Sequence, residues 1–300
     1  MTYFYRLAGE NLKLAEAELK GFVKTQGIAE VKRKGQLAMT REHPDQLKRL
    51  ALTHEVIREI EPEKYRPNGS YAVRTENLSE KEFDREKIVS EIGEKISGLT
   101  NTVDLENPKN IVKAYKTEKG LIIGELVQDI QRGLFDERSN ENRPFSSPIS
   151  MDPVLARVLV NLSETSAGEF ILDPFCGTGG ILIEAGLCGI GVKGLDIQEE
   201  MVSGTEENLE NYGILNHEIR KGDISDIKEI FDEYDAVISD LPYGKASKQE
   251  NKALEKFLDL IEDFDGKTVF MYNEASLGDY EADFEVYVHK NLTRHIFLLQ

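Results

Sequence analysis

Apolar runs of strand length recur along the second half of the chain, separated by segments in which apolar residues repeat at helical spacing. The runs predicted to form strands lie at 170–173, 192–196, 218–222, 234–240, 267–273, 284–290 and 294–299. Helices separate the first five, a pattern typical of parallel strands with crossover helices, whereas the last two are spaced as an antiparallel hairpin. We therefore expect residues 151–300 to form a mostly parallel, doubly wound α/β sheet with a reversed edge strand.

The first half has shorter and less regular elements. Strands are predicted at 3–8, 28–40 with a break at Gly35, 71–74, 102–105, 111–116 and 121–128. Helices are predicted across 15–23, from Pro44 through Leu47, Leu50 and Ile57, and, after a capping box at 79–82, across Ile88, Ile92 and Ile96. Proline, asparagine and glycine concentrate at 61–70, which is typical of a boundary. The expected domains are 1–62 and 63–130, both α+β, with a linker at 131–150 before the domain 151–300.

Charge is distributed unevenly between the two halves. The formal net charge is −18, yet residues 1–150 hold 25 Lys and Arg against 25 Asp and Glu, which leaves 12 against 30 in residues 151–300. An acidic half resists nonspecific association with polyanions, whereas a neutral half with basic clusters can still bind phosphate. The cluster Lys32-Arg33-Lys34 is compatible both with a phosphate contact and with a solvated strand edge.

Several classes of protein are disfavoured by composition. No apolar run approaches the roughly 18 residues that a membrane span needs, and the first residues lack the layout of a signal peptide, so we expect a cytoplasmic protein without a membrane span. The two cysteines, Cys176 and Cys188, match no paired-cysteine zinc pattern, and the five histidines are scattered. Neither a disulfide nor a metal site is expected.

A glycine-rich loop follows the predicted strand at 170–173 and opens a helix. It reads Asp173-Pro174-Phe175-Cys176-Gly177-Thr178-Gly179. Glycines in this place let the backbone turn sharply and approach a ligand closely. Leu182 stands where a nicotinamide-binding loop carries its third glycine, which disfavours a dehydrogenase.

Two further acids end the next two predicted strands. Asp196 lies 23 residues after Asp173, where ribose hydroxyls bind in doubly wound folds, and Asp223 is placed to accept a hydrogen bond from an adenine amino group. Ile197 and Ile224 supply apolar surface for the ring. A single such Asp commonly only caps a helix or a turn, but the ordered set favours an adenosine with a cationic tail.

A fourth acid opens the tetrapeptide Asp240-Leu241-Pro242-Tyr243 after the apolar run at 234–239. An exocyclic amine is a weak nucleophile because its lone pair is delocalised, so an enzyme must direct that lone pair with hydrogen-bond acceptors. Asp240 and the backbone carbonyl of Leu241 can supply two acceptors, Pro242 fixes the turn, and Tyr243 offers a flat face to a base. The alternative is that Asp240 caps a turn and Tyr243 packs in the core.

These motifs resemble those of class I S-adenosylmethionine-dependent methyltransferases, with their Rossmann-like seven-stranded domain, over residues 147–300. The resemblance implies that Asp173, Gly177 and Gly179 flank the methionine part of the cofactor, with Cys176 and Thr178 in the same loop. Asp196 is then assigned to the ribose, Asp223 to the adenine, and Asp240 to the reaction centre. The tetrapeptide resembles the Asp-Pro-Pro-Tyr motif of amino-methyltransferases, with Leu241 in place of the usual proline.

The segment before 151 resembles the one that closes over the methionine end in these enzymes. Phe145 and Ser147 are therefore candidates for lining the cofactor site. An ordinary linker packed on the sheet is the alternative.

In the first half, the strand at 71–74, its helix, the segment 103–108 and the strand at 120–126 resemble a THUMP domain, an RNA-binding module, preceded by its ferredoxin-like partner. The combination resembles the archaeal tRNA (guanine(10)-N2)-methyltransferases, which add one or two methyl groups. This resemblance implies S-adenosylmethionine as cofactor and tRNA as partner. The alternatives are N2-methylation of another guanine, such as position 6 of tRNA or one in rRNA, a nonenzymatic RNA-binding protein, and methylation of a protein glutamine amide.

Overall fold

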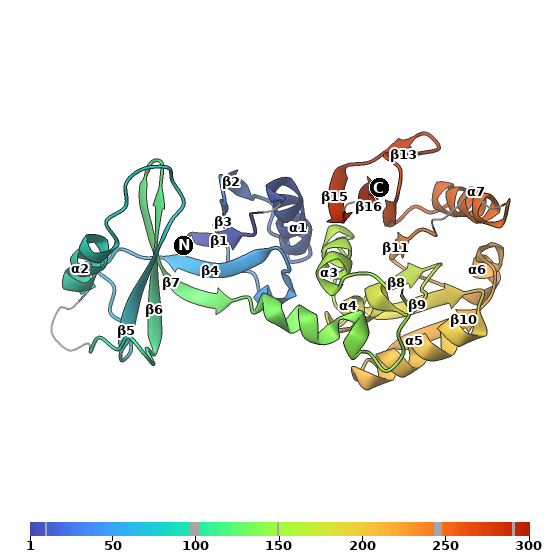
Figure 1. Ribbon diagram of the computed structural model, residues 1–300, viewed down its shortest axis with the longest axis horizontal. Helices are drawn as coiled ribbons and strands as arrows, with labels where there is room; N and C mark the ends of the chain where they lie inside the picture. The colour runs from blue at the N-terminus through green and yellow to red at the C-terminus, as the bar shows by residue number, and fades with distance from the viewer. Residues whose placement is uncertain (10, 97–101, 149, 243–247, 290–291) are drawn as a thin grey trace. The chain divides into compact units, whose positions relative to one another are not determined.

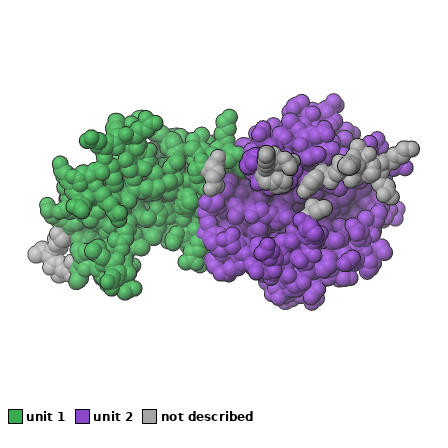
Figure 2. Space-filling model, viewed as in Figure 1, with its two compact units in different colours: residues 1–16, 28–48, 53–131 green, residues 17–27, 49–52, 132–300 purple. Residues whose placement is uncertain are grey.

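The structure is a computed structural model that describes all residues except 10, 97–101, 149, 243–247 and 290–291. The chain divides into two compact units, each with its own seven-stranded sheet (Figure 2). Unit 1 comprises residues 1–16, 28–48 and 53–131, and unit 2 comprises residues 17–27, 49–52 and 132–300. Among the described residues, no helix is both long enough and apolar enough to cross a membrane.

Unit 2 is built on a sheet with the strand order β10-β9-β8-β11-β12-β16-β15 (Figure 1). In chain order the strands are β8 (Phe170–Asp173), β9 (Gly191–Asp196), β10 (His217–Lys221), β11 (Ala236–Asp240), β12 (Lys267–Tyr272), β15 (Phe284–His289) and β16 (Leu292–Leu299). The first five strands are parallel, whereas β16 is antiparallel to both β12 and β15. The predicted mostly parallel sheet with a reversed edge is confirmed, and it has the Rossmann-like order that reverses between β8 and β11.

Helices cover both faces of this sheet. They are α3 (Pro153–Leu162), α4 (Gly180–Gly186), α5 (Glu199–Asn211), α6 (Ile227–Ile230) and α7 (Lys248–Glu262). The helices α3 and α4 lie on one side of the strands in Figure 1, and α6 and α7 lie on the other. On the side of α7, Phe257 and Phe270 pack edge to face, and Phe270 stacks on Phe297 with ring centroids 4.5 Å apart. A short hairpin, β13 (Ser276–Leu277) with β14 (Tyr280–Glu281), follows β12.

Unit 1 has the strand order β2-β3-β1-β4-β7-β6-β5, in which only β5 and β6 are parallel neighbours. Its strands are β1 (Tyr3–Leu7), β2 (Lys32–Lys34), β3 (Leu37–Thr40), β4 (Thr53–Glu59), β5 (Tyr71–Asn77), β6 (Asn110–Thr117) and β7 (Gly120–Asp129). The helix α2 (Arg85–Ile96) packs Ile92 and Ile96 against Tyr71 of β5. Because β4 pairs with β7, the strands of 1–62 and 63–130 share one continuous sheet.

The predicted helix from Pro44 to Ile57 is wrong. This segment instead forms one turn of 3-10 helix, η1 (Leu47–Arg49), followed by β4. Leu47, Leu50 and Ile57 are all buried, so their spacing imitated a helix face although they belong to three different local structures. The β-branched residues of β4 fit a strand that is covered on both edges by β1 and β7.

Smaller differences concern element ends. The first helix is α1 (Leu12–Lys24), somewhat longer than predicted. The cap of α2 is Asp84, whose Oδ1 accepts the Lys87 N–H at 3.1 Å, and the expected capping box at 79–82 precedes the helix as a bend. The expected strand at 102–105 is reduced to one bridge between Tyr71 and Val103. Local capping residues therefore predicted the presence of helices better than their first residue.

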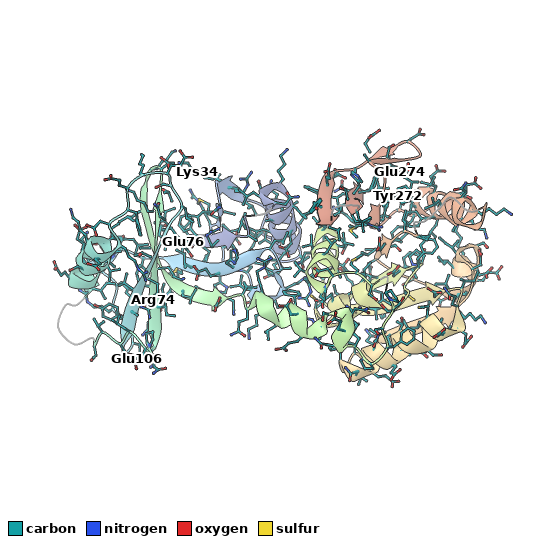
Figure 3. The ribbon with its side chains drawn as sticks, viewed as in Figure 1. Lys34, Arg74, Glu76, Glu106, Tyr272 and Glu274 are labelled. Atoms are coloured by element: carbon teal, nitrogen blue, oxygen red, sulfur yellow. The ribbon has the colours of Figure 1, made fainter. Side chains whose placement is uncertain are left out.

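The basic run at β2 is largely engaged with acids of its own unit. Lys32 Nζ lies 2.7 Å from Glu30, and Arg33 Nε lies 2.5 Å from Glu16. Desolvation, together with the nearby Lys119, lowers the pKa of Lys34, which lies near the tip of the sheet in Figure 3. Lys32 and Arg33 are thus ion-paired, as expected for a strand edge, whereas Lys34 lies near another cation, Lys119.

Candidate active site

A cavity of about 690 Å³ opens in unit 2 at the carboxyl ends of β8, β9, β10 and β11. This is the edge at which doubly wound sheets bind ligands, and the volume is in the range of small-molecule sites. The sequence-predicted residues that line it are Ser147, Asp173, Cys176, Gly177, Thr178, Asp196, Ile197, Asp223, Ile224, Asp240, Leu241 and Pro242. The fold therefore brings together side chains from four strand ends.

The glycine-rich loop turns through two residues in the left-handed region, Gly177 with φ +51° and Gly179 with φ +78°. A Cβ at Gly177 would meet open space, so this position requires glycine for its backbone angle, whereas one at Gly179 would lie 2.8 Å from Thr205 Cγ2. The Thr205 hydroxyl donates to the Gly177 carbonyl at 2.6 Å and holds the loop from α5. Gly179 is the N-cap of α4 and does not line the cavity. Burial raises the pKa of the Cys176 thiol, which suits an inert filler.

Asp173 is almost completely buried at the end of β8. Its Oδ1 accepts the Ser239 hydroxyl at 2.7 Å and the Phe175 N–H at 3.1 Å. Desolvation raises the pKa of Asp173 to about 7, against these two hydrogen bonds and with a further contribution from Asp196. A buried carboxyl with so high a pKa is poised to accept a cationic ligand group, which would favour its ionised form.

Asp196 ends β9 and orients the loop as well as the cavity. Its Oδ2 accepts the Gly177 N–H at 3.1 Å and its Oδ1 accepts the Gln198 N–H at 2.9 Å. Partial burial raises its pKa against both bonds. Next to it, Ile197 is 65% exposed although apolar, so it presents bare hydrocarbon surface to the cavity.

Asp223, beyond β10, combines the two roles weighed from sequence. It lines the cavity, and it also caps the one-turn helix η4 (Ile224–Asp226), where its Oδ1 accepts the Ser225 N–H at 3.0 Å. The same Oδ1 accepts Lys256 Nζ from α7 at 2.6 Å, and this ion pair lowers the pKa of Asp223 to about 2. Ile224 is buried beside it.

Asp240 and Leu241 leave β11 in opposite directions. Asp240 faces the cavity with 27% of its side chain exposed, and it forms an ion pair with Arg294 of β16. The Leu241 side chain is fully buried among Leu172, Phe257 and Phe270, and its N–H donates to the Met271 carbonyl at 2.9 Å. A proline could make neither this hydrogen bond nor the same apolar contact. Tyr243 lies outside the described residues.

The segment before α3 contributes Ser147, Ser150 and Met151 to the cavity, but not Phe145. Asn140 holds Ser147 through its side-chain amide, which donates to the Ser147 carbonyl at 2.7 Å. Phe145 packs instead against Gly204 of α5, where a Cβ would lie 2.1 Å from its ring, and its N–H donates to Asn208. Ser147 thus has the expected place, and Phe145 has the place of a linker residue packed on the domain.

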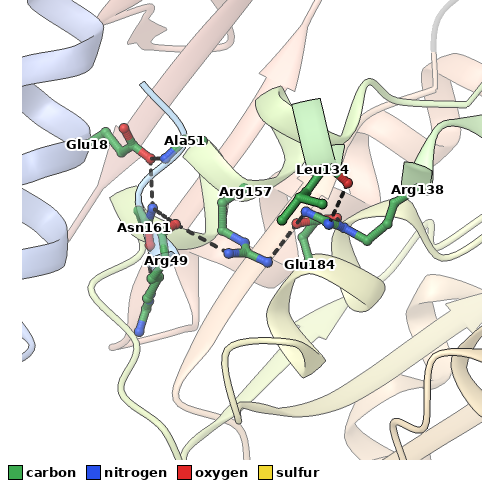
Figure 4. Close-up of polar contacts among 8 residues, drawn as sticks. All are labelled: Glu18, Arg49, Ala51, Leu134, Arg138, Arg157, Asn161 and Glu184. Atoms are coloured by element: carbon green, nitrogen blue, oxygen red, sulfur yellow. Dashed lines mark hydrogen bonds and ion pairs between the residues drawn. The ribbon is translucent and has the colours of Figure 1, made fainter. Parts of the chain in front are cut away.

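A buried polar network holds α4 behind the glycine-rich loop (Figure 4). Glu184 of α4 is fully buried and accepts Arg138 Nε at 2.7 Å and Arg157 at 2.7 Å. A second group lies beside it, in which the Asn161 amide donates to Glu18 at 2.8 Å and accepts Arg49 Nε at 2.6 Å. Burial raises the pKa of Glu18. Removing one partner from such pairs leaves a buried charge uncompensated, so these contacts restrict how the loop-bearing helix can shift.

Sequence reasoning missed Gln198, Met201, Lys252 and Lys256 of the cavity lining, and also Ser239 and Arg294, which contact Asp173 and Asp240. Two of these had a weak signal, because Ser239 directly follows the apolar residues Ala236-Val237-Ile238 and Arg294 is a cation in a strand that ends in the apolar residues 296–299. Lys256 was hidden in a helix rich in charged residues. Among the described residues, no group of three or more His, Cys, Asp or Glu side chains is arranged to hold a metal ion.

The donor set fits an adenosine with a cationic tail. Asp173 supplies a buried acceptor whose pKa is already raised, Asp196 lies at the adjacent strand end, and Ile197 gives exposed apolar surface. A Cβ at Gly177 would meet no atom within 4 Å, so the loop leaves open space at this position. The cavity thus contains the acids predicted at successive strand ends, together with the apolar residues Ile197 and Ile224 that follow two of them.

Comparison with known proteins agrees with this arrangement. Residues 140–274 match the family model described as an RMKL-like methyltransferase domain. The fold is similar to that of TrmN from Thermus thermophilus, with a TM-score of 0.54 at 17% identity over 100% of this chain and 99% of that one. A putative methyltransferase, SMU.472, solved with SAH, gives 0.53 at 13% identity over 99% of this chain and 97% of that one. At these identities the structural likeness concerns the fold alone. Fold and site together define an S-adenosylmethionine-dependent methyltransferase of the Rossmann-like class.

Sequence relatives specify the family. The chain is 39% identical over 233 residues to tRNA (guanine(10)-N2)-dimethyltransferase of Methanothermobacter thermautotrophicus, covering 71% of this chain and 68% of that protein. It is 36% identical over 255 residues to the protein of the same name from Pyrococcus abyssi, covering 77% and 74%. The chain belongs to the tRNA (guanine(10)-N2)-dimethyltransferase family.

Proposed function

We propose that this protein transfers methyl groups from S-adenosylmethionine to the exocyclic N2 of guanine 10 in tRNA, once or twice per nucleotide. The observation that carries the proposal is Asp240, an ionisable acceptor at the cavity edge, one strand away from the buried Asp173. The relatives that are named for this reaction support the choice of substrate.

The chain's own residues divide the work. Asp173 would hold the ammonium group of the cofactor, Asp196 its ribose, and Ile197 and Ile224 the faces of its adenine. When bound, the cofactor would supply an electrophilic methyl group on a sulfonium, whose sulfur keeps the electron pair of the carbon–sulfur bond that breaks; the proton that the methylated amine loses can pass to the Asp240 carboxylate and then to solvent. Asp240 accepts one N–H of the guanine amine, which directs the nitrogen lone pair, and the Leu241 carbonyl accepts the other.

Direct transfer to nitrogen needs no covalent bond to the protein. Burial of Leu241 and its hydrogen bond to Met271 hold the turn that presents these acceptors, so most of the rate is expected from alignment. A guanine within a helix must first be flipped out of its stack to reach the cavity.

Residues 1–62 and 63–130 are proposed to be the ferredoxin-like and THUMP domains that bind the tRNA, in the cytoplasm. The support is compositional, because the acidic excess lies in 151–300 and the basic residues of the first half are balanced by an equal number of acids. On this account tRNA affinity falls as salt is raised, since phosphate contacts release counterions.

The test uses unmodified tRNA transcripts with labelled cofactor, followed by nucleoside mapping. N2-methylguanosine and then N2,N2-dimethylguanosine at position 10 are expected, and a transcript with adenine at position 10 should remain unlabelled. Asp240→Asn, which keeps shape but replaces an acceptor oxygen by a donor, serves as the inactive control. Labelling that persists in the substituted transcript would identify another guanine, such as position 6. Absence of N2-methylated guanosine in tRNA, with rRNA or a glutamine peptide labelled instead, would overturn the proposal.

A further inference from the structure

Arg294 is a buried cation at the catalytic strand end to which the proposed reaction assigns no part. It belongs to β16, and only 3% of its side chain is exposed. Burial lowers the pKa of Arg294 to about 10, so the guanidinium remains charged at neutral pH. A charge buried to this extent is costly unless an anion compensates it, and Asp240 is such an anion.

The topology explains how two residues 54 positions apart meet. In the parallel pair β11 and β12, Asp240 is opposite Met271, and in the antiparallel pair β12 and β16, Tyr272 is opposite His295. Arg294 therefore enters the sheet at the edge where Asp240 leaves it. Reversal of β16 is what puts a residue near the start of this strand at the carboxyl edge of β11.

The cavity carboxylates differ in whether they have a cation partner. Asp223 pairs with Lys256, and Asp240 pairs with Arg294. Desolvation instead raises the pKa values of Asp173 and Asp196, and their described hydrogen bonds come from hydroxyl and backbone donors. Arg294 thus supplies charge to the one acid that must accept an amine N–H, in a cavity otherwise crowded with carboxyl groups.

We propose that Arg294 is a positioning residue that keeps Asp240 ionised and fixes its rotation, so that the carboxylate is preorganised as the acceptor for the target amine. This inference rests on the proposed function. The ion pair joins Arg294 to Oδ1 of Asp240, and a guanidinium held by a sheet restricts the carboxylate more than solvent would. When the Asp240 carboxylate is already fixed, the target amine that binds to it is held in line with the methyl group for more of the time.

The experiment compares Arg294→Met, Arg294→Lys and Arg220→Met in single-turnover methylation of tRNA. Arg220 is an exposed arginine on β10 and serves as the matched control. Arg294→Met is expected to lower the rate of methyl transfer about 100-fold, as for an ångström-scale misplacement, while KM for tRNA and cofactor Kd change less than about threefold. Arg294→Lys should recover at least about tenfold of this loss because it restores the charge without the planar fork.

Other results would overturn the inference. These are a transfer rate for Arg294→Met within about twofold of the wild type, losses that Lys does not recover, or losses that appear mainly as weaker binding. A purely structural role would lower the amount of folded protein and leave the rate per cofactor-binding site unchanged. The Asp240→Asn and Arg294→Met substitutions, combined in one chain, should also be non-additive in urea unfolding midpoints, since each removes the same pair.

The two proposals fail separately. If the wild type methylates guanine 10 and Arg294→Met does so equally fast, only the positioning role is lost. If the wild type makes no N2-methylguanosine while cofactor binds, the proposed function is lost, and the positioning role for guanine falls with it. The unfolding midpoints then still report whether Arg294 and Asp240 are coupled, and additive midpoints would exclude the pair itself.

Discussion

Asp173 and Asp223 occupy equivalent places and have opposite environments. Each lies at the carboxyl end of a parallel strand and lines the same cavity. Asp173 is buried beneath the sheet edge, where desolvation raises its pKa to about 7, whereas the partly exposed Asp223 pairs with Lys256, which lowers its pKa to about 2. The same residue type at the same topological position therefore titrates near neutral pH in one case and stays ionised down to about pH 2 in the other.

Because their environments differ, the two acids of one cavity can interact with different strength with two parts of a ligand. A carboxyl whose charged form is disfavoured gains most from a cationic ligand group, because binding offsets its desolvation. A carboxylate that already has a cation gains less from a further donor. The two acids should consequently contribute unequally to cofactor binding.

Replacing each acid by its amide measures this inequality most directly. Asp173→Asn removes the charge that would pair with an ammonium in a buried site and is expected to weaken cofactor binding about 100-fold, whereas Asp223→Asn should weaken it only about fivefold. Calorimetric titration with cofactor measures both, and the two substitutions are matched controls for each other. Equal losses would show that the contrast between buried and ion-paired acid has no functional consequence.

At the end of β11 the chain is held by a backbone hydrogen bond from Leu241 to Met271 and not by a carboxyl group. Leu241→Pro removes the hydrogen bond to the Met271 carbonyl and part of a buried side chain, so a loss of about 2–3 kcal/mol in the free energy of unfolding is expected. Leu241→Met, which conserves volume and the N–H, should cost less than about 1.5 kcal/mol. Urea unfolding compares them. A proline variant as stable as the methionine variant would mean that the turn is held by other contacts.

The pH dependence of cofactor binding distinguishes the two acids without any substitution. Asp173 must lose its proton to pair with a cation, so affinity should rise about tenfold per pH unit on the acid side of its pKa, about 7, and level off above it. Asp223, with a pKa of about 2, is already ionised in this range. The Asp173→Asn variant gives the control, since it retains only the titration of the ligand. An unchanged slope in that variant would contradict the assignment.

The smallest effect is expected for the Lys256 ion pair. Its partner Asp223 has a lowered folded-state pKa, so the pair stabilises the fold above the ordinary carboxyl pKa, and this contribution is lost as pH falls toward about 2. Because both groups are more than a third exposed, Lys256→Met should cost only about 0–1 kcal/mol at neutral pH. Thermal melts at neutral and acid pH measure the difference between variant and wild type. A difference that grows on acidification would have the wrong sign.

Agreement between sequence and structure was closest where a strand is buried on both faces. The runs before Asp173 and Asp240 are short and apolar, which favours strands covered on both faces, and both are observed as β8 and β11. Agreement failed at Pro44 to Ile57, because a spacing of buried residues along the chain does not reveal that they pack in different elements. Strand pairing with β1 and β7 decided that segment.

The candidate site shows the same division. The glycine-rich loop and the ordered acids were readable because each motif is local and its residue types are dictated by backbone geometry and by ligand charge. Phe145 was also placed in the site from sequence, but its ring packs on Gly204, a contact across about sixty residues that no local pattern encodes. Arg294 was missed for the same reason.

By itself, the sequence of this protein determined the succession of the seven strands of unit 2, the loop that turns at Gly177 and the acids that end the strands, because these depend on residues near one another in the chain. Only the tertiary structure decided that burial raises the pKa of Asp173, that Asp223 pairs with Lys256 and that Asp240 pairs with Arg294. Those properties depend on burial and on neighbours from distant strands, and electrostatic energies change with both.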